Sequence, residues 1–135
     1  MRSTSTPSVI DLRLLDSSVL VARLSGDDAN HAKAVGIEFP DAEINELVLA
    51  EVATVLHRKS GGTRVAAQAV CDVFRNVPMR LLDGHDMAAA MELYSSSFSK
   101  LSLTDCSLIV QAQRFDAELL TFDEELARAA KRILR

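Results

Sequence analysis

Tryptophan is absent from this 135-residue sequence, and aromatic residues make up only 4% of it. The hydrophobic core must therefore be aliphatic, because Leu, Val, Ile and Ala supply most of the 48% hydrophobic content. The scarcity of aromatic rings also argues against a platform on which single-stranded RNA bases stack. Cysteine is scarce too. Cys71 and Cys106 are too few for a disulfide framework and show no paired zinc-type spacing, which predicts free thiols in a reducing compartment.

The sequence has no hydrophobic run long enough to cross a bilayer. The apolar stretch from Leu14 to Leu24 is short and contains Asp16. Residues Met1 to Arg13 lack the apolar region of a secretory signal. These absences predict a cytoplasmic protein without a membrane partner.

An excess of positive charge is also missing, since 19 acidic residues oppose 15 basic ones and the net charge is −4. At first sight this disfavours a nucleic-acid partner, because phosphate binding depends on Lys and Arg. Four of the acids form the candidate site described below. Setting them aside leaves 15 acidic residues against 15 basic ones. The overall charge therefore does not exclude nucleic acid.

Short apolar segments alternate with helical patterns along the chain, which predicts a parallel sheet with helices on both faces. We expect residues 1–11 to form a flexible tail and residues 12–135 to form a single domain. The expected fold class is α/β, a three-layer α/β/α domain with a central parallel sheet of four or five strands and about seven helices. The expected strands lie at Leu12–Leu15, within Phe39–Ile44, at Val77–Leu82 and at Leu119–Phe122.

Polar residues mark the predicted starts of the main helices. Ser17 and Ser18 are expected to cap the first helix, and Asn45 a helix from Glu46 to about Arg58. Further along, we expect Thr104 to cap one helix and Asp123 to open the last.

Four acidic residues occupy positions typical of a ligand site. Asp16 ends the first predicted strand and Asp123 the last, while Asp105 lies in the first turn of one helix and Glu51 in the second turn of another. Ligands of open parallel sheets bind beyond the carboxyl ends of the strands, so we expect these carboxylates to converge there. Repulsion between them would be relieved by a hard cation, Mg²⁺ or Mn²⁺.

Each acid also has a structural explanation. Asp16 can cap a helix, and Asp105 and Asp123 can be first-turn acids favoured by the helix dipole. Glu46 competes with Glu51, but the two lie about 140° apart around a helix, so only one can face the site. We assign Glu51 to the site and expect Glu46 to face solvent.

Other polar residues have supporting roles in this hypothesis. The hydroxyls of Ser17 and Thr121 are predicted to orient a metal-binding carboxylate, although capping and strand propensity explain them as well. Arg58, Lys59 and Arg64 flank a Gly-Gly turn and are candidate RNA phosphate contacts, with a solvated helix end as the alternative.

Three segments resemble the PIN-domain nucleases, particularly the VapC-like toxins of toxin–antitoxin systems. "LLDSSVLVARL" resembles the opening strand with its aspartate, Asp16. "INELVLAEVATVL" resembles the second motif, with its glutamate at Glu51. "LSLTDCSLIVQAQRFDAELLTFDEEL" resembles the closing block, with Asp105 and Asp123. Asn45 departs from the family pattern, which often has Ser or Thr there, but Asn caps a helix equally well.

The resemblance implies a metal-dependent endoribonuclease in which Asp16, Glu51, Asp105 and Asp123 hold Mg²⁺ or Mn²⁺. It also implies an RNA substrate, homodimerisation and inhibition by a small VapB-like antitoxin. The expected reaction is in-line attack on the phosphodiester by an activated water, which leaves a 5′-phosphate and a 3′-hydroxyl. Two alternatives remain at this point. One is a catalytically weak interaction module whose acids receive an arginine from a partner, and the other is a related DNA nuclease.

Overall fold

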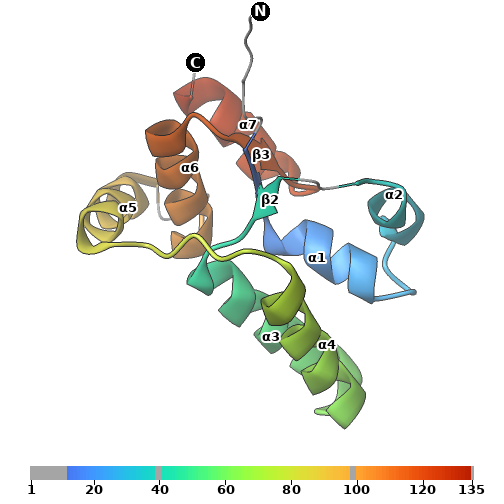
Figure 1. Cartoon of the computed structure of the whole chain (residues 1–135). Coiled ribbons are helices and arrows are strands. Elements are labelled where there is room, and N and C mark those ends of the chain that lie inside the picture. Colours follow the sequence, from blue (N-terminus) through green and yellow to red (C-terminus); the bar gives the residue numbers. More distant parts are fainter. Residues whose placement is uncertain (1–11, 39–40, 98–99, 135) are drawn as a thin grey trace, which may run out of the picture.

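The computed structural model describes residues 12–38, 41–97 and 100–134, so the predicted tail at residues 1–11 lies outside the described residues. Three strands and seven helices form the described part of the chain (Figure 1). In chain order they are β1 Arg13–Leu15, α1 Ser17–Leu24, α2 His31–Val35, β2 Ala42–Glu43, α3 Glu46–Ser60, α4 Arg64–Asn76, α5 Gly84–Ser97, α6 Leu103–Phe115, β3 Glu118–Leu120 and α7 Glu124–Ile133.

The sheet is parallel, as predicted, and β1 is its central strand. The strand order is β2-β1-β3, with Arg13 opposite Ala42 on one side and opposite Glu118 on the other. The hydrogen bond from Asp16 N to Leu120 O, 3.0 Å long, continues the β1–β3 pairing past the end of β1. The first and last strands therefore end side by side, at the same edge of the sheet.

The predicted number of strands was too high. Three strands form in the described residues instead of four or five, and the expected strand at Val77–Leu82 contributes one parallel bridge, between Met79 and Ile44. Pro78 has no N–H to donate, and the N–H of Leu82 turns away to the carboxylate of Glu46. The ladder therefore stops after a single rung.

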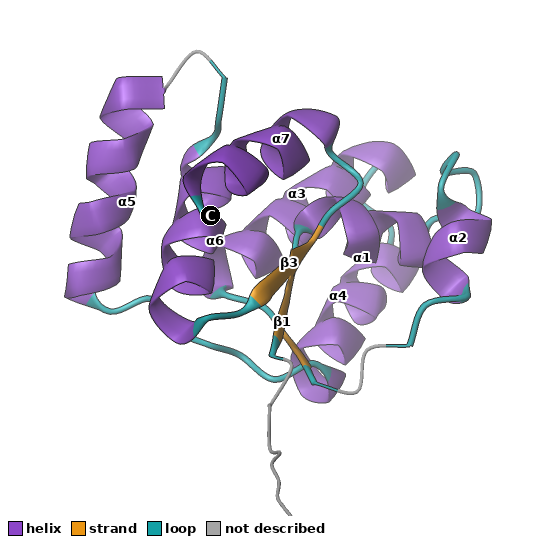
Figure 2. Cartoon of the chain, turned by 90° about the horizontal axis from the view of Figure 1, so that it is seen from above, coloured by secondary structure: helices purple, strands orange, loops and turns teal. Residues whose placement is uncertain are grey.

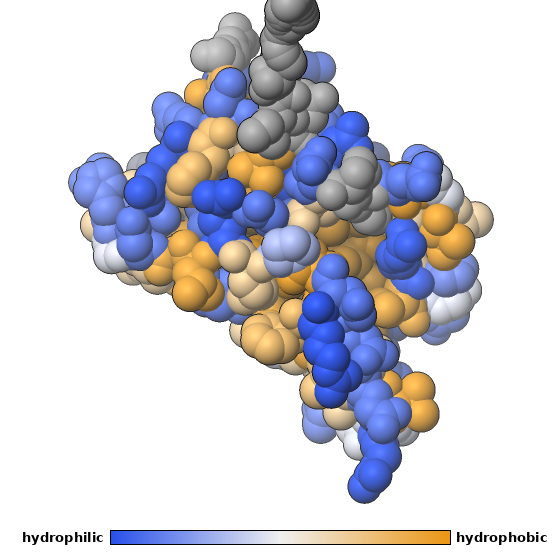
Figure 3. All heavy atoms as spheres, in the orientation of Figure 1, coloured by the Kyte–Doolittle hydropathy of each residue, from blue (hydrophilic) through white to orange (hydrophobic). Residues whose placement is uncertain are grey.

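Helices lie on both sides of this narrow sheet, with α5 and α6 on one side and α1 and α2 on the other (Figure 2). The core between them is aliphatic, as the composition predicts. Its largest fully buried hydrophobic side chains are Leu14, Leu15, Ile44, Leu108, Ile109 and Leu126. The helix α4 packs on α3 and buries only Val73, and its outward face is largely hydrophilic (Figure 3). No described helix has the length and apolar character that crossing a membrane requires.

Two of the predicted helix caps differ from those in the structure. Asn45 caps α3 as predicted and accepts a 2.9 Å hydrogen bond from Val48 N. The helix α1, however, begins at Ser17, with Asp16 in the capping position. Ser102, not Thr104, caps α6, because its hydroxyl accepts from Asp105 N while Asp105 accepts from Ser102 N, which makes a reciprocal capping box. Asp105 is therefore fixed at the start of its helix.

Candidate active site

Asp16 lies at the centre of the candidate site, between the ends of β1 and β3. Its side chain is only 3% exposed. The Oδ2 atom accepts hydrogen bonds from the hydroxyl of Ser18, at 2.8 Å, and from that of Thr121, at 2.7 Å. A buried carboxylate is costly unless it is hydrogen-bonded or paired with a cation. These two donors stabilise Asp16 in part and fix its orientation.

The same two hydroxyls hold the turn after β3. Ser18 Oγ accepts from Phe122 N at 2.9 Å, and Thr121 Oγ1 accepts from Asp123 N at 2.9 Å. This turn is thereby held beside Asp16, and Asp123 is placed at its end. The sequence reasoning missed Ser18 as an orienting residue and treated it only as a cap. The available signal was a second hydroxyl two residues after the aspartate.

Glu51 joins the site through α3. The hydroxyl of Ser17 donates a short hydrogen bond to Glu51 Oε1, across 34 residues of sequence. Ser17 is buried directly after Asp16, and Glu51 is half-buried. Ser17 thus contacts the carboxylate of Glu51, as the predicted orienting role requires, whereas its predicted role as a cap was wrong.

Asp105 faces the other acids from the start of α6. The pKa of its carboxyl is raised to about 6, chiefly by burial and also by the negative charges of Asp16 and Asp123, while hydrogen bonds from Ser102 oppose the shift. The electrostatic effect of Asp16 and Asp123 on this pKa places the three carboxylates in one neighbourhood. Two helices and the end of the first strand therefore bring negative charge to one place.

Asp123 caps the last helix, which was one of its two predicted roles. Its Oδ1 atom accepts from Glu125 N at 2.9 Å and from Leu126 N at 3.2 Å. The residue is exposed, unlike Asp16. Capping does not use the whole carboxylate, since the second oxygen stays available to a ligand.

All four acids follow this pattern. Within the described part of the chain, the hydrogen bonds of each carboxylate reach a single oxygen. These oxygens are Oδ2 of Asp16, Oε1 of Glu51, Oδ2 of Asp105 and Oδ1 of Asp123. One oxygen of each side chain is thus held in place by the protein, and the other has no protein donor there.

This donor set fits a hard cation in its chemistry, because it consists of carboxylate oxygens without thiols or imidazoles. In residues 12–38, 41–97 and 100–134, no group of three or more His, Cys, Asp or Glu side chains is placed to hold a metal ion directly. Mg²⁺ commonly keeps several of its waters and takes only one or two carboxylates. The arrangement therefore fits a hydrated Mg²⁺ or Mn²⁺ ion better than a closed cage of protein ligands.

The other predicted residues lie elsewhere. Arg58 is seven residues after Glu51 on α3, about 10 Å along the helix axis. Lys59 pairs with Asp27 at 3.5 Å, and the phosphate-binding role given to Arg58, Lys59 and Arg64 stays a prediction. Glu46 was expected to face solvent, but it is half-buried and accepts a 2.9 Å hydrogen bond from Leu82 N.

Comparison with known proteins gives a consistent picture. The PIN domain family model matches residues 13–132. The structure of VapC20 from Mycobacterium tuberculosis, a Sarcin-Ricin loop cleaving toxin, is similar with a TM-score of 0.76 and 20% identity, over 87% of this chain and 94% of that one. No curated protein matches the sequence.

Two further solved structures share the fold. PAE2754 from Pyrobaculum aerophilum matches with a TM-score of 0.62 and 18% identity, over 85% of this chain and 76% of the other. VapBC2 from Rickettsia felis, bound to a DNA fragment from their promoter, matches with a TM-score of 0.60 and 15% identity, over 87% and 92% of the two chains.

Proposed function

Because this chain belongs to the PIN domain family, we propose that it is a metal-dependent endoribonuclease and the toxin of a toxin–antitoxin pair. One observation carries the proposal. Asp16 lies at the end of β1, and the other three carboxylates are linked to this point by hydrogen bonds through Ser17 and Thr121 or by charge. Each of the four keeps one oxygen without a protein donor in the described residues. Such oxygens suit a divalent cation that is shared with a phosphodiester.

In this proposal Asp16, Glu51, Asp105 and Asp123 hold Mg²⁺ or Mn²⁺, directly or through waters. The bound ion supplies charge for the phosphate and lowers the pKa of a water. Ser18 and Thr121 orient Asp16, and Ser17 orients Glu51, so that the acids keep their positions when the substrate arrives. No protein nucleophile is required.

The toxin assignment draws on two of the structural relatives. One is a toxin that cleaves the Sarcin-Ricin loop, and the other is a VapBC assembly bound to promoter DNA. By analogy we infer a small VapB-like antitoxin as the partner of this chain. A homodimer and a cytoplasmic location complete the proposal.

The test compares the wild-type chain with its Asp16→Asn variant on total RNA and on DNA, with Mg²⁺, Mn²⁺ or EDTA. We expect RNA cleavage that needs the metal and leaves 5′-phosphate ends, which sequencing of RNA 5′ ends detects. The variant is expected to fold, because Asn still accepts a hydrogen bond from a hydroxyl, but not to cleave. Cleavage by Asp16→Asn at the native rate would exclude the assigned site. Cleavage of DNA alone would favour a DNA nuclease, and tight binding of Mn²⁺ without any cleavage would favour an interaction module.

A further inference from the structure

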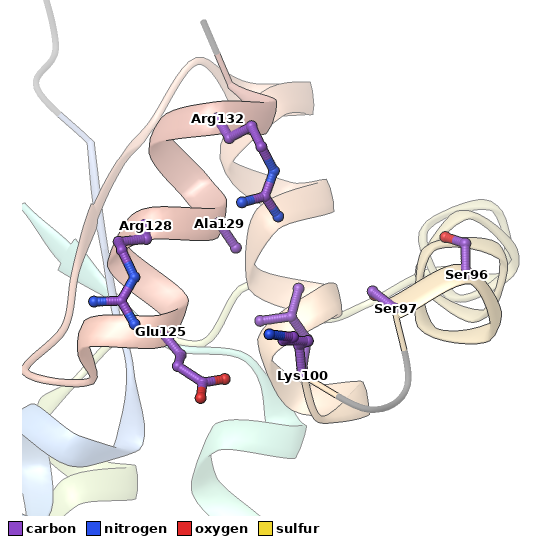
Figure 4. Close-up of a pocket in the computed structure, with 8 residues that line it drawn as sticks. Ser96, Ser97, Lys100, Glu125, Arg128, Ala129 and Arg132 are labelled. Atoms are coloured by element: carbon purple, nitrogen blue, oxygen red, sulfur yellow. The ribbon is translucent and has the colours of Figure 1, made fainter.

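A basic groove lies beside the candidate active site, between α5, α6 and α7. It has a volume of about 330 Å³. Its polar lining consists of three cations, two hydroxyls and one acid, which are Lys100, Arg128, Arg132, Ser96, Ser97 and Glu125 (Figure 4).

The three cations are available to a ligand. Lys100, Arg128 and Arg132 are all exposed. Arg128 contacts Glu124 at 4.0 Å, an exposed ion pair of the kind that contributes little energy. Lys100 and Arg132 form no salt bridge within the described residues. Their charge is therefore not neutralised by a strong partner in the protein.

Two of the helices beside the groove, α6 and α7, carry acids of the candidate site at their N-terminal ends. Asp105 lies in the first turn of α6, and Lys100 precedes it by five residues, just before the helix. Asp123 caps α7, and Arg128 and Arg132 follow it by about 7.5 Å and 13.5 Å along the helix axis. Arg128 and Arg132, four residues apart, thus present positive charge on one face of α7, farther along the helix than Asp123.

We propose that this basic groove binds the backbone phosphates of an RNA strand next to the bond that is cleaved. The inference rests on the proposed nuclease function and adds to it a surface that holds the substrate. The bound ion would offset the charge of the acids at the cleaved bond only, so an adjacent source of positive charge would help to retain the neighbouring phosphates of the strand. Arg side chains match phosphate geometry with two parallel donors, and the groove has no aromatic residue in its lining on which a base could stack.

The experiment measures RNA binding separately from cleavage. The full chain carries Asp16→Asn so that the RNA stays intact, and the probe is a fluorescein-labelled single-stranded RNA of mixed sequence. Fluorescence anisotropy is recorded between about 50 and 200 mM KCl, where phosphate contacts dominate the salt dependence. Lys100→Ala and Arg132→Ala are each added to this background. Lys131→Ala is the matched control, because Lys131 is an exposed cation of the same helix outside the lining of the groove.

Each groove variant is expected to weaken binding about fivefold near 0.1 M salt and to reduce the salt slope by about 0.7, the value of one phosphate contact on a single strand. Lys131→Ala is expected to leave both quantities unchanged. Equal losses for Lys131→Ala and Arg132→Ala would overturn the proposal, because they would indicate diffuse charge in place of a groove. Loss of binding only with Arg58→Ala, measured in the same background, would also overturn it and would place the RNA near the C-terminal end of α3.

The failure of this inference can be told from failure of the proposed function. If the chain with native Asp16 cleaves RNA and the groove variants bind and cleave normally, the groove proposal is wrong and the nuclease proposal stands. If the native chain cleaves no RNA although the groove variants weaken binding as expected, the groove proposal stands and the catalytic assignment is wrong.

Discussion

Thr121 donates a 2.7 Å hydrogen bond from its hydroxyl to Oδ2 of Asp16, across 105 residues of sequence. The same hydroxyl accepts from Asp123 N at 2.9 Å. A single side chain therefore fixes the orientation of one candidate ligand and the backbone position of another. Such contacts behind a metal-binding carboxylate often matter almost as much as the ligand itself.

Replacing Thr121 by Val keeps the shape of the side chain and removes both hydrogen bonds. We expect RNA cleavage to fall by about 10- to 100-fold, as is usual for the loss of a residue that orients a ligand. The free energy of unfolding should fall by about 1 kcal/mol. Initial cleavage rates and urea unfolding measure the two effects. Thr121→Ser is the control, since it keeps the hydroxyl, and equal loss of cleavage in both variants would argue against an orienting role.

Glu51→Gln and Glu46→Gln form a matched pair on one helix. Glu51 accepts from Ser17 beside Asp16, whereas Glu46 accepts from Leu82 N. Because Gln keeps an acceptor oxygen in both cases, neither variant should unfold. We expect Glu51→Gln to lose at least tenfold in cleavage rate at fixed Mg²⁺, since a carboxylate ligand is lost, while Glu46→Gln keeps the native rate. The opposite result would show that the wrong glutamate was assigned.

Asn45 supports the fold behind the site. It is fully buried, caps α3 through Val48 N, and donates to Ser107 at 3.0 Å and to Gln111 at 3.1 Å on α6. Asn45→Ala loses a helix cap, about 1 kcal/mol, and leaves buried partners unpaired, about 1–3 kcal/mol more. Asn45→Ser keeps the cap but is too short to reach Gln111, so its loss in urea unfolding should be smaller. Equal losses would mean that the contacts with α6, and not the cap, account for the stabilisation by Asn45.

The sequence predicted the alternation of strands and helices because it depends on local patterns, and the same patterns suggested the four acids, whose role stays a prediction. Asp16 directly follows an apolar strand, and Asp123 directly precedes a helical pattern, so their positions at strand ends could be read along the chain. The parallel pairing of β1 with β3 then brings the two together. The aliphatic core also followed directly from the composition.

The features that were missed depend on contacts between distant segments. The Val77–Leu82 strand has the right composition, but Pro78 and the hydrogen bond of Leu82 N to Glu46 limit it to one bridge. Nothing in the local sequence shows that Ser18 reaches across to Thr121 and Phe122. The cap of α6 was placed two residues late because Ser102 and Thr104 both belong to the residue types that cap helices, although Ser is the better of the two.

Asp105 provides a test of the acidic site that does not require a substrate. Its pKa is raised to about 6, chiefly by burial and then by the charges of Asp16 and Asp123. The folded state therefore binds its proton more tightly than the unfolded chain, whose pKa is near 3.8. The contribution of the Asp105 carboxyl to the stability of the folded state is therefore fully present below pH 3.8, and it is lost as the pH rises through about 6.

Asp105→Asn removes this charge, and its side-chain oxygen still accepts from Ser102 N. In EDTA at neutral pH we expect the variant to be more stable than the wild type by about 1 kcal/mol, a value reduced from that of the full shift because the carboxyl is only half-buried. The difference should vanish near pH 4 in urea unfolding. Added Mn²⁺ should reverse the order, because binding to the native state stabilises only the protein that keeps its ligands. A variant that is less stable than the wild type at neutral pH in EDTA would instead assign Asp105 to the capping box, with no repulsive cluster at all.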